Sequence, residues 1–219
     1  MTTFYESTDF PMTTVYESTD FRLTIETDND PQNPREWDNY TTMVCAHNRY
    51  SLGDESVRGI ERHRDWELYL KENILDGVEE DDVIWLPLYL YDHSGITIST
   101  TPFSSRWDSG QVGWIYAHKD DLMEFPGVYE DNTFYDDRAY EVLKNEVKTY
   151  DQYLTGQVYG YTLEKREKCH CCNHVTYDEL DSCWSIYADS EDEATRFIVD
   201  MLPEEADGLV DSHNIIRND

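Results

Sequence analysis

The sequence predicts an α+β fold: a single domain with a mostly antiparallel sheet and about three helices. Three observations carry this prediction. Hydrophobic residues make up 39% of the 219 residues and aromatic residues 14%, which is enough to fill one core despite a high charge. Short strand-like runs are joined by turn sequences rather than by helices, which favours antiparallel pairing. Three other stretches repeat their apolar residues at helical spacing.

The first 27 residues are predicted to form an N-terminal arm. Thr2–Phe10 reads TTFYESTDF and Thr13–Phe21 reads TTVYESTDF, so a unit with an eleven-residue period occurs twice. A solenoid needs at least three stacked repeats, so a local duplication explains the pattern better. The Thr, Ser and Asp content is typical of an exposed segment, whereas the aromatic residues would let it dock as an edge strand. We therefore expect an arm over residues 1–27 and an α+β domain over residues 28–219.

The first secondary-structure elements of the domain are predicted from helix- and strand-breaking residues and from the spacing of apolar residues. Asp28–Asn39 contains two prolines and several Asn and Asp residues, which predicts a loop. Thr41–His47 reads as a buried strand. Apolar residues then recur at i, i+3, i+4 and i+8 from Trp66, which predicts a helix over Glu61–Leu75.

Three strands are predicted next, separated by two turns. Ile84–Tyr91 is a dense apolar run in which Pro87 indicates an edge strand or a bulge. Asp92–Gly95 is a turn sequence that leads into the alternating run Ile96–Thr101, so the two runs are expected to form a hairpin. Asp108–Gly110 is a second turn, followed by a third antiparallel strand.

Two further helices are expected in the second half. Apolar residues keep helical spacing over Asp137–Leu154, and Gly156 supplies the stop. Ser190 and Glu193 have the spacing of a capping box ahead of another apolar stripe, and Pro203 ends that helix.

The segment between these helices holds the candidate metal site. Val158–Leu163 and Ser182–Tyr187 read as paired strands, with a Cys-rich excursion over residues 165–180 between them. The two-residue gap of a zinc knuckle and a Cys and a His nearby predict one structural zinc with four ligands: Cys169, Cys172, His174 and Cys183. The alternative is a set of reduced thiols, because a second paired knuckle is missing. Five Cys is an odd number, which favours a reducing cytoplasm over disulfides.

A polar cluster is the candidate for acid/base or divalent-metal chemistry. Asp92, His93 and Asp108 lie in two turns expected at the same edge of the sheet. Asp92-His93-Ser94 is not read as a catalytic triad, because adjacent residues in a tight turn cannot form the Ser to His to Asp relay. Carboxylates are abundant here, so their meeting a His is expected by chance, and the usual nucleotide, hydrolase and zinc-protease motifs are absent. We therefore expect a protein that is not an enzyme.

The net charge limits the classes of molecule that the protein is expected to bind. Against 47 Asp and Glu residues stand 17 Lys and Arg residues, a formal net charge of −30. Such a coat suits a protein that stays hydrated in the molar salt of a halophile's cytoplasm; the alternative is mimicry of duplex phosphates toward a DNA-binding protein. Direct binding to nucleic acid or to an anionic membrane is not expected, because no cluster of Lys and Arg is longer than Lys165-Arg166-Glu167-Lys168. No apolar run reaches the length of a spanning helix, and the N-terminus lacks a secretion signal.

Several tracts carry a family resemblance. The tracts are NPREWDN (33–39), TMV (42–44), YSLGD (50–54), LPLYLYDHSGITISTTPF (86–103), WDSGQVGWIY (107–116), YDQYLTGQVYGY (150–161) and DSCW (181–184). In these the chain resembles an uncharacterised family of small proteins encoded by tailed phages, archaeal viruses and integrated mobile elements. The resemblance implies a viral or mobile-element origin and no particular reaction.

Three function classes follow for such a gene. The first is an accessory protein in the host cytoplasm that binds and blocks a host or defence protein, with Trp107, Trp114 and Tyr116 as candidate interface aromatics. The second is a minor virion or assembly protein, located in the virion, whose repeated arm reaches a neighbouring subunit. The third is a metal-dependent enzyme of nucleic-acid metabolism, which would need Asp92, His93 and Asp108 to converge in a cleft.

Overall fold

The structure is a computed structural model that describes residues 13–58, 60, 63–105, 107–210 and 215–217. It confirms the α+β class with mostly antiparallel sheets. The chain divides into two compact units: one joins the stretch up to Gln32 with the stretch from Gly156 onward, and the other is Asn33–Thr155. We describe each unit by itself.

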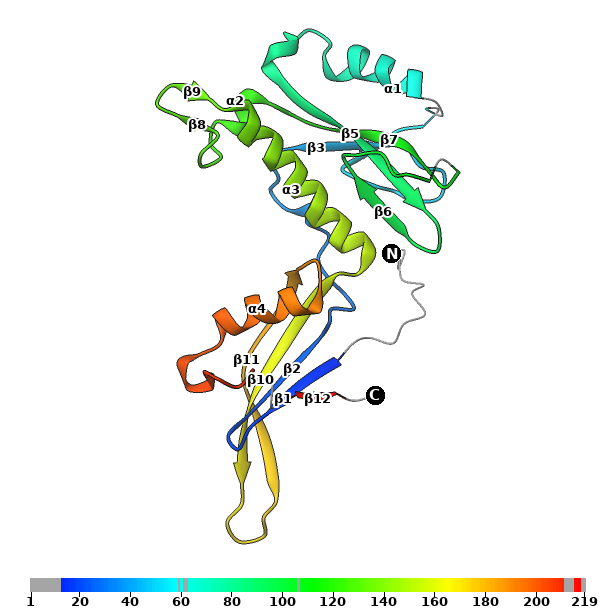
Figure 1. Ribbon diagram of the computed structural model, residues 1–219. Helices are drawn as coiled ribbons and strands as arrows, with labels where there is room; N and C mark the ends of the chain where they lie inside the picture. Colours follow the sequence, from blue (N-terminus) through cyan, green and yellow to red (C-terminus); the bar gives the residue numbers. More distant parts are fainter. Residues whose placement is uncertain (1–12, 59, 61–62, 106, 211–214, 218–219) are drawn as a thin grey trace. The chain divides into compact units, whose positions relative to one another are not determined.

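The first unit is a five-stranded antiparallel sheet with one helix on it (Figure 1). Its strands follow the order β11-β10-β2-β1-β12, with β1 at Thr13–Glu17, β2 at Phe21–Thr27, β10 at Val158–Lys168, β11 at Val175–Tyr187 and β12 at Ile215–Arg217. Helix α4 (Glu191–Met201) packs across this sheet, and a 3-10 turn follows at Glu204–Ala206. The core lies between Leu23 and Leu163 on the strands and Ile198 on α4.

The second copy of the repeat is part of this sheet. Residues 13–17 form β1, which pairs with β2 on one side and β12 on the other. Tyr16 is 7% exposed and faces the core, so the apolar residues of the repeat, and not its polar residues, decide its place. The first copy, Thr2–Phe10, lies outside the described residues.

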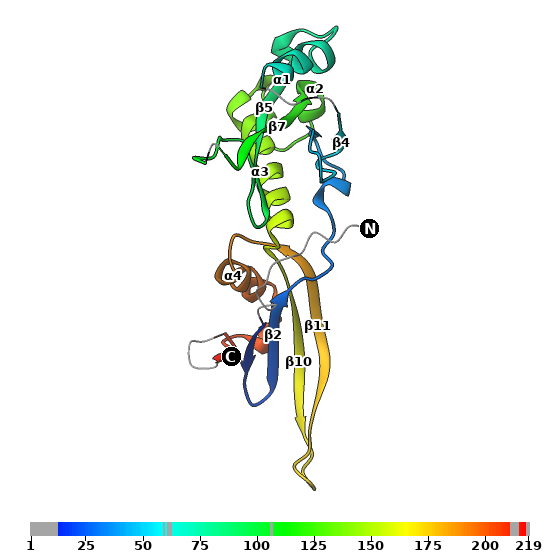
Figure 2. The same ribbon diagram turned by 90° about the vertical axis from the view of Figure 1, so that its right-hand side faces the viewer.

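Strands β10 and β11 continue past the rest of the sheet. The last residue pair between β10 and β2 is Lys165 with Phe21, whereas β10 and β11 remain paired to Lys168 and Val175. Figure 2 shows the resulting two-stranded ribbon, which ends in the segment 169–174. The expected Cys-rich excursion is therefore a continuation of the hairpin itself.

The second unit has a five-stranded sheet in the order β4-β3-β7-β5-β6. These strands are β3 (Thr42–Cys45), β4 (Glu55–Ser56), β5 (Val83–Asp92), β6 (Ile96–Ser99) and β7 (Ser109–His118), and the pairing of β3 with β4 is parallel. A separate two-stranded sheet consists of β8 (Tyr129–Glu130) and β9 (Thr133–Phe134).

The described residues of this unit form three α-helices. They are α1 (His63–Tyr69), α2 (Lys119–Leu122) and α3 (Asp136–Thr155), with short 3-10 turns at Pro34–Glu36 and Glu80–Asp82. Helix α1 runs on as a π-helical turn over Leu70–Ile74 and packs through Trp66 against Val44 and Trp114 of the sheet. Helix α3 contacts β5, β6 and β7, and Gly156 ends it at φ +76°, as predicted.

Two expectations about β5 need refinement. Pro87 does not mark an edge strand, because β5 lies between β7 and β6. Strand β6 pairs only with Tyr89–Asp92, so the backbone at Pro87 has one neighbouring strand, and a register shift follows between Leu88 and Tyr89. The third strand of the predicted series, β7, pairs with β5 rather than with β6.

Candidate functional site

The predicted polar cluster is present at one end of the second unit's sheet. Asp92 is the last residue of β5, and Asp108 directly precedes β7. Because these strands pair antiparallel, the Asp92 amide donates to the Asp108 carbonyl oxygen at 2.8 Å. The Nδ1 atom of His93 lies 3.9 Å from Oδ1 of Asp108. His93 thus lies near the Asp108 carboxylate, whereas Asp92 meets Asp108 through backbone atoms.

Two residues that the sequence did not point to complete this cluster. His47 Nε2 lies 3.5 Å from Oδ2 of Asp92, and the guanidinium of Arg49 donates to the same oxygen. Both come from the segment after β3. Strand β3 ends at Cys45, opposite Gly113 near the start of β7, so the chain leaves β3 beside the end of β5. Only the order of the strands could have revealed this.

The charges of the cluster are largely balanced. Burial lowers the pKa of His47, the Asp92 carboxylate opposes that shift, and the Arg49 charge adds to it. His47 is therefore mostly neutral at pH 7, and Arg49 is the cation that faces Asp92. A carboxylate held by an arginine is well suited to fix a loop or to offer a charged rim.

The three candidate interface aromatics have different environments. Trp107 is 96% exposed, whereas Trp114 is 8% exposed and its Nε1 donates to the Trp66 carbonyl oxygen at 2.9 Å. Tyr116 is half-buried against the same core cluster, and burial raises its pKa. The prediction is therefore wrong for Trp114 and Tyr116, which alternation along β7 places on the face that packs against α1. Trp107 alone of the three is free for a partner.

The loop that carries Trp107 is tied down on both sides of it. The Ser105 hydroxyl donates to Oδ2 of Asp108 at 3.2 Å, and the Ser109 hydroxyl donates to the Ser105 carbonyl oxygen. On the neighbouring hairpin the Tyr91 ring lies 5.8 Å from Phe103 and 6.2 Å from His93, centroid to centroid. We call the set Tyr91, His93, Phe103, Trp107 and Asp108 the Trp107 surface.

The tip of the β10–β11 ribbon brings three thiols together. The sulfur atoms of Cys169, Cys171 and Cys172 all lie within 4.8 Å of one another, so this cluster could hold a metal ion. The backbone closes the tip, because the Cys169 amide donates to the His174 carbonyl oxygen at 2.7 Å and the Asn173 amide donates to the Cys169 carbonyl oxygen at 2.9 Å.

The predicted ligand set is corrected by this geometry. Cys183 pairs with Tyr161 and packs at the core, eight residues along β11 from Val175, which at about 3.3 Å per residue places it roughly 26 Å from the tip. His174 contributes backbone closure and is not part of the thiol cluster. Cys171 takes the place of Cys183 and His174 in the cluster. The two-residue spacing of a zinc knuckle could not indicate Cys171, because that spacing selects Cys169 and Cys172.

The electrostatics of the tip favour a thiolate. A hydrogen bond from the Cys171 thiol, together with the backbone amides of Cys171 and Cys172, lowers the pKa of Cys169 to about 6. The same contact raises the pKa of Cys171. Thiolates are the form in which cysteines bind metals, so the tip has one ligand ready at neutral pH.

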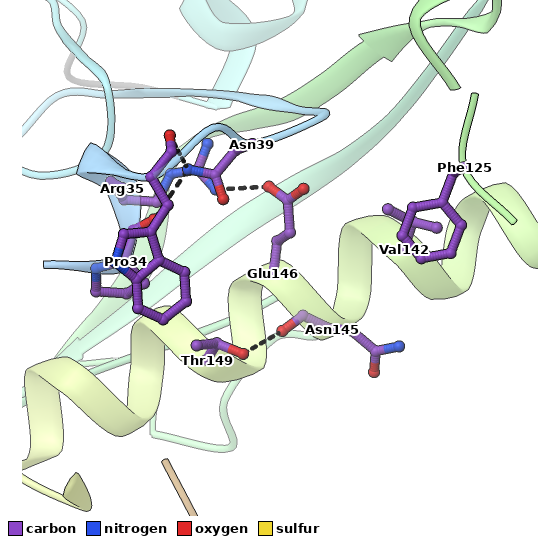
Figure 3. Close-up of a pocket in the computed structure, with 9 residues that line it drawn as sticks. Pro34, Arg35, Asn39, Phe125, Val142, Asn145, Glu146 and Thr149 are labelled. Atoms are coloured by element: carbon purple, nitrogen blue, oxygen red, sulfur yellow. Dashed lines mark hydrogen bonds and ion pairs between the residues drawn. The ribbon is translucent and has the colours of Figure 1, made fainter. Parts of the chain in front are cut away.

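A small pocket lies between the loop around Pro34 and helix α3. It has a volume of about 170 Å³, and Figure 3 shows Glu146 and Thr149 projecting into it from α3, with Phe125 beside Val142. Its wall is a buried ionic network: the side chain of Arg35, 2% exposed, donates to Oε2 of Glu146 at 2.7 Å and to both carboxylate oxygens of Asp54. The guanidinium of Arg35 is paired with these carboxylates and holds the loop to α3. It therefore has few hydrogen-bond donors left for a ligand.

Comparison with known proteins finds no family model, curated protein or solved structure that matches this chain. Among the described residues, none of the helices has the length and apolar character needed to cross a membrane. The candidate sites are therefore argued from their own geometry.

Proposed function

We propose that this chain is an acidic accessory protein, encoded by a virus or mobile element, that binds and blocks a host or defence protein in the host cytoplasm. The observation that carries the proposal is Trp107, 96% exposed on a loop whose two sides are held by hydrogen bonds. Tryptophan is the side chain most enriched among residues that dominate interface energies.

The setting of Trp107 suits recognition. The hydrogen bonds among Ser105, Asp108 and Ser109 hold residues on both sides of Trp107, which reduces the conformational entropy that binding costs, so more of the burial energy of the indole remains as affinity. Asp108 follows Trp107 in the sequence and lies beside His93, whose ring is near the half-buried ring of Tyr91, and Tyr91 in turn is near Phe103. An apolar anchor with a polar rim is the usual anatomy of a protein interface.

The charge of the chain indicates the chemistry of the partner. A net charge of −30 disfavours an acidic partner and speeds encounter with a basic one. A DNA-binding protein, whose groove is basic, is the partner class for which the carboxylates would imitate phosphates. Salt adaptation is the other explanation of the acidic surface. Under mimicry, binding of the partner depends on Trp107 and is reversed by competing DNA; under salt adaptation it has neither property.

The test is a pull-down with matched variants from host lysate at the host's native salt. Wild-type protein, Trp107→Ala and Trp37→Ala serve as baits; Trp37 is 43% exposed and lies away from the Trp107 surface in the chain. We expect one protein to be retained by wild type and by Trp37→Ala and lost with Trp107→Ala. That protein, once purified, should lose its activity on addition of wild-type chain and regain it with excess duplex DNA if mimicry operates. Equal capture by all three baits would contradict the proposal.

A second candidate, a minor virion or assembly protein, is favoured by the repeat. The second copy forms β1, a strand paired along both edges, and the first copy differs from it only at Phe4 in place of Val15. A segment with the sequence of β1 can add to the same position in another subunit. Co-purification with particles, lost when residues 2–10 are deleted, would support this role. The enzyme alternative is not proposed, because Arg49 holds the Asp92 carboxylate.

For the ribbon tip we propose one zinc ion, bound by the thiolates of Cys169, Cys171 and Cys172. Three sulfur atoms within 4.8 Å support it, since zinc prefers sulfur ligands in tetrahedral geometry. The zinc would hold the tip closed, where the described residues offer no apolar core.

A further inference from the structure

A cleft of about 990 Å³ lies between the segment after β3 and the segment after β4 in the second unit. It lies beside the polar cluster, with which it shares His47 and Arg49, but Trp107 is not among its lining residues. The inference drawn from it does not depend on the proposed partner surface.

The charge of this cleft is opposite to that of the chain. Acidic residues outnumber basic ones by 47 to 17 overall, yet the described lining contains no carboxylate and includes Arg49, Arg58 and His47. Asp92 stands behind the lining and neutralises Arg49. Arg58 is exposed, and no carboxylate among the described residues pairs with it, so it supplies an available positive charge.

Hydroxyl groups lie within the same lining. The Ser51 and Ser56 side-chain oxygens are 3.1 Å apart, and both residues are exposed. Two hydroxyl groups and a guanidinium can donate hydrogen bonds to phosphate oxygens. An arginine can bind such an anion with two parallel hydrogen bonds. This part of the cleft is therefore suited to a phosphate group.

A second part of the cleft offers a flat wall and an acceptor. The rings of His47 and Tyr50 are stacked, with centroids 4.9 Å apart and planes 8° from parallel. Gln111 Oε1 is buried and has no hydrogen-bond donor among the described residues, whereas its Nε2 donates to the Gly113 carbonyl oxygen at 3.3 Å. A buried acceptor without a donor is costly, and a ligand N–H would satisfy it.

From these features we infer that the cleft binds a nucleoside monophosphate. Its phosphate lies against Arg58 and the Ser51 and Ser56 hydroxyls, and its base presents an N–H group to Gln111 Oε1. The volume is within the range of small-molecule sites and large enough for a mononucleotide. The binding is noncovalent, so no co-reactant is needed.

The test is thermal unfolding of the full chain with three probes at matched ionic strength: inorganic phosphate, ribose 5-phosphate and AMP. We expect AMP to raise the melting temperature in a saturable manner and to bind more tightly than the other two probes. Arg58→Gln should weaken all three by about tenfold, because it removes the charge that meets the phosphate. Gln111→Ala should weaken AMP while leaving ribose 5-phosphate unchanged.

The control is Arg196→Gln, which removes the same charge from exposed helix α4 and should bind as wild type does. Absence of saturable binding by wild type would overturn the inference, as would Arg58→Gln binding with wild-type affinity. AMP binding no tighter than phosphate would overturn the assignment to a nucleotide. Because each comparison uses melting temperature differences within one variant, a variant of altered stability still gives a readable result.

Discussion

The indole ring of Trp184 lies directly on the backbone of Gly160. A Cβ atom at position 160 would stand 2.2 Å from Cε3 and 2.6 Å from Cδ2 of that ring, although the two residues belong to neighbouring strands. The close approach occurs beside a register shift in the pairing of β10 with β11, between Tyr159 and Tyr161. The glycine thus gives the ring a place on the sheet, although Trp184 stays 44% exposed.

Gly160→Ala is expected to displace that ring. The added methyl group cannot share the space, but the ring is partly exposed and can turn outward, so the loss of stability should be about 1–3 kcal/mol. Chemical denaturation would measure it, and a red shift of tryptophan emission would report the displaced indole. Unchanged emission and stability would show that the contact is not present in solution.

Gly113→Ala offers a comparison in which the obstacle is backbone. A Cβ there would stand 2.0 Å from the Val44 carbonyl oxygen, which belongs to β3 and cannot turn aside. Strand β3 would have to move from β7, so we expect a larger loss than for Gly160→Ala, about 3 kcal/mol or more. The same denaturation experiment ranks the two variants, and the reverse order would contradict the explanation.

The elements that sequence predicted well are those specified by local pattern. Helix α3 and its Gly156 stop depend on neighbouring residues only, and so does the start of α4, where the Ser190 hydroxyl accepts from the Glu193 amide. Strand pairing depends on distant residues: nothing near Cys45 announces Gly113 as its neighbour. This is why the meeting of Asp92, His93 and Asp108 was predictable from two adjacent turns, while His47 and Arg49 were missed.

The same reasoning explains the error in the metal site. Spacing in sequence points to the tip where the thiol cluster lies, but it makes Cys183 look close only because Cys183 is the ninth residue after His174. The strands run on to Lys168 and Val175 before they turn, so those nine residues are extended and carry Cys183 away. A strand that continues through charged residues has no hydrophobic signal to reveal its length.

The network around Arg35 should be far more sensitive than the ion pair of Arg49. Arg35→Ala leaves the Asp54 and Glu146 carboxylates without their buried partner, for which we expect a loss of about 3–5 kcal/mol. The Arg49 side chain is 62% exposed, so Arg49→Ala should have a much smaller effect. Thermal or urea unfolding compares the two. A similar loss in both variants would mean that burial of Arg35 is overstated.

His47 is expected to titrate below its value in the unfolded chain, about 6.5. Burial lowers its pKa, so the folded state binds fewer protons than the unfolded state, and stability is lost as pH falls from about 6.5 through the folded pKa. The charges that face His47 determine how substitutions change its pKa. Asp92→Asn should lower the pKa further, and Arg49→Gln should raise it. NMR titration of the imidazole, assigned with His47→Gln, measures this. A pKa above that of the unfolded chain would contradict the burial of His47.

Substitution of Cys171 and of Cys183 tests the cysteine cluster. The sequence spacing selects Cys183 as a zinc ligand and leaves Cys171 out, whereas the structure places Cys171 in the cluster and Cys183 far from it. If zinc binds at Cys169, Cys171 and Cys172, then Cys171→Ser should lose most of the affinity, whereas Cys183→Ser should keep it, because Cys183 lies far along β11. Cobalt titration of the reduced protein, followed through the thiolate-to-cobalt charge-transfer band and displacement by zinc, measures both variants. Ligand thiols must lose their protons to bind, so affinity should also fall as the pH is lowered. Loss of the band in Cys183→Ser with retention in Cys171→Ser would restore the ligand set that the spacing predicted and would overturn the cluster at the ribbon tip.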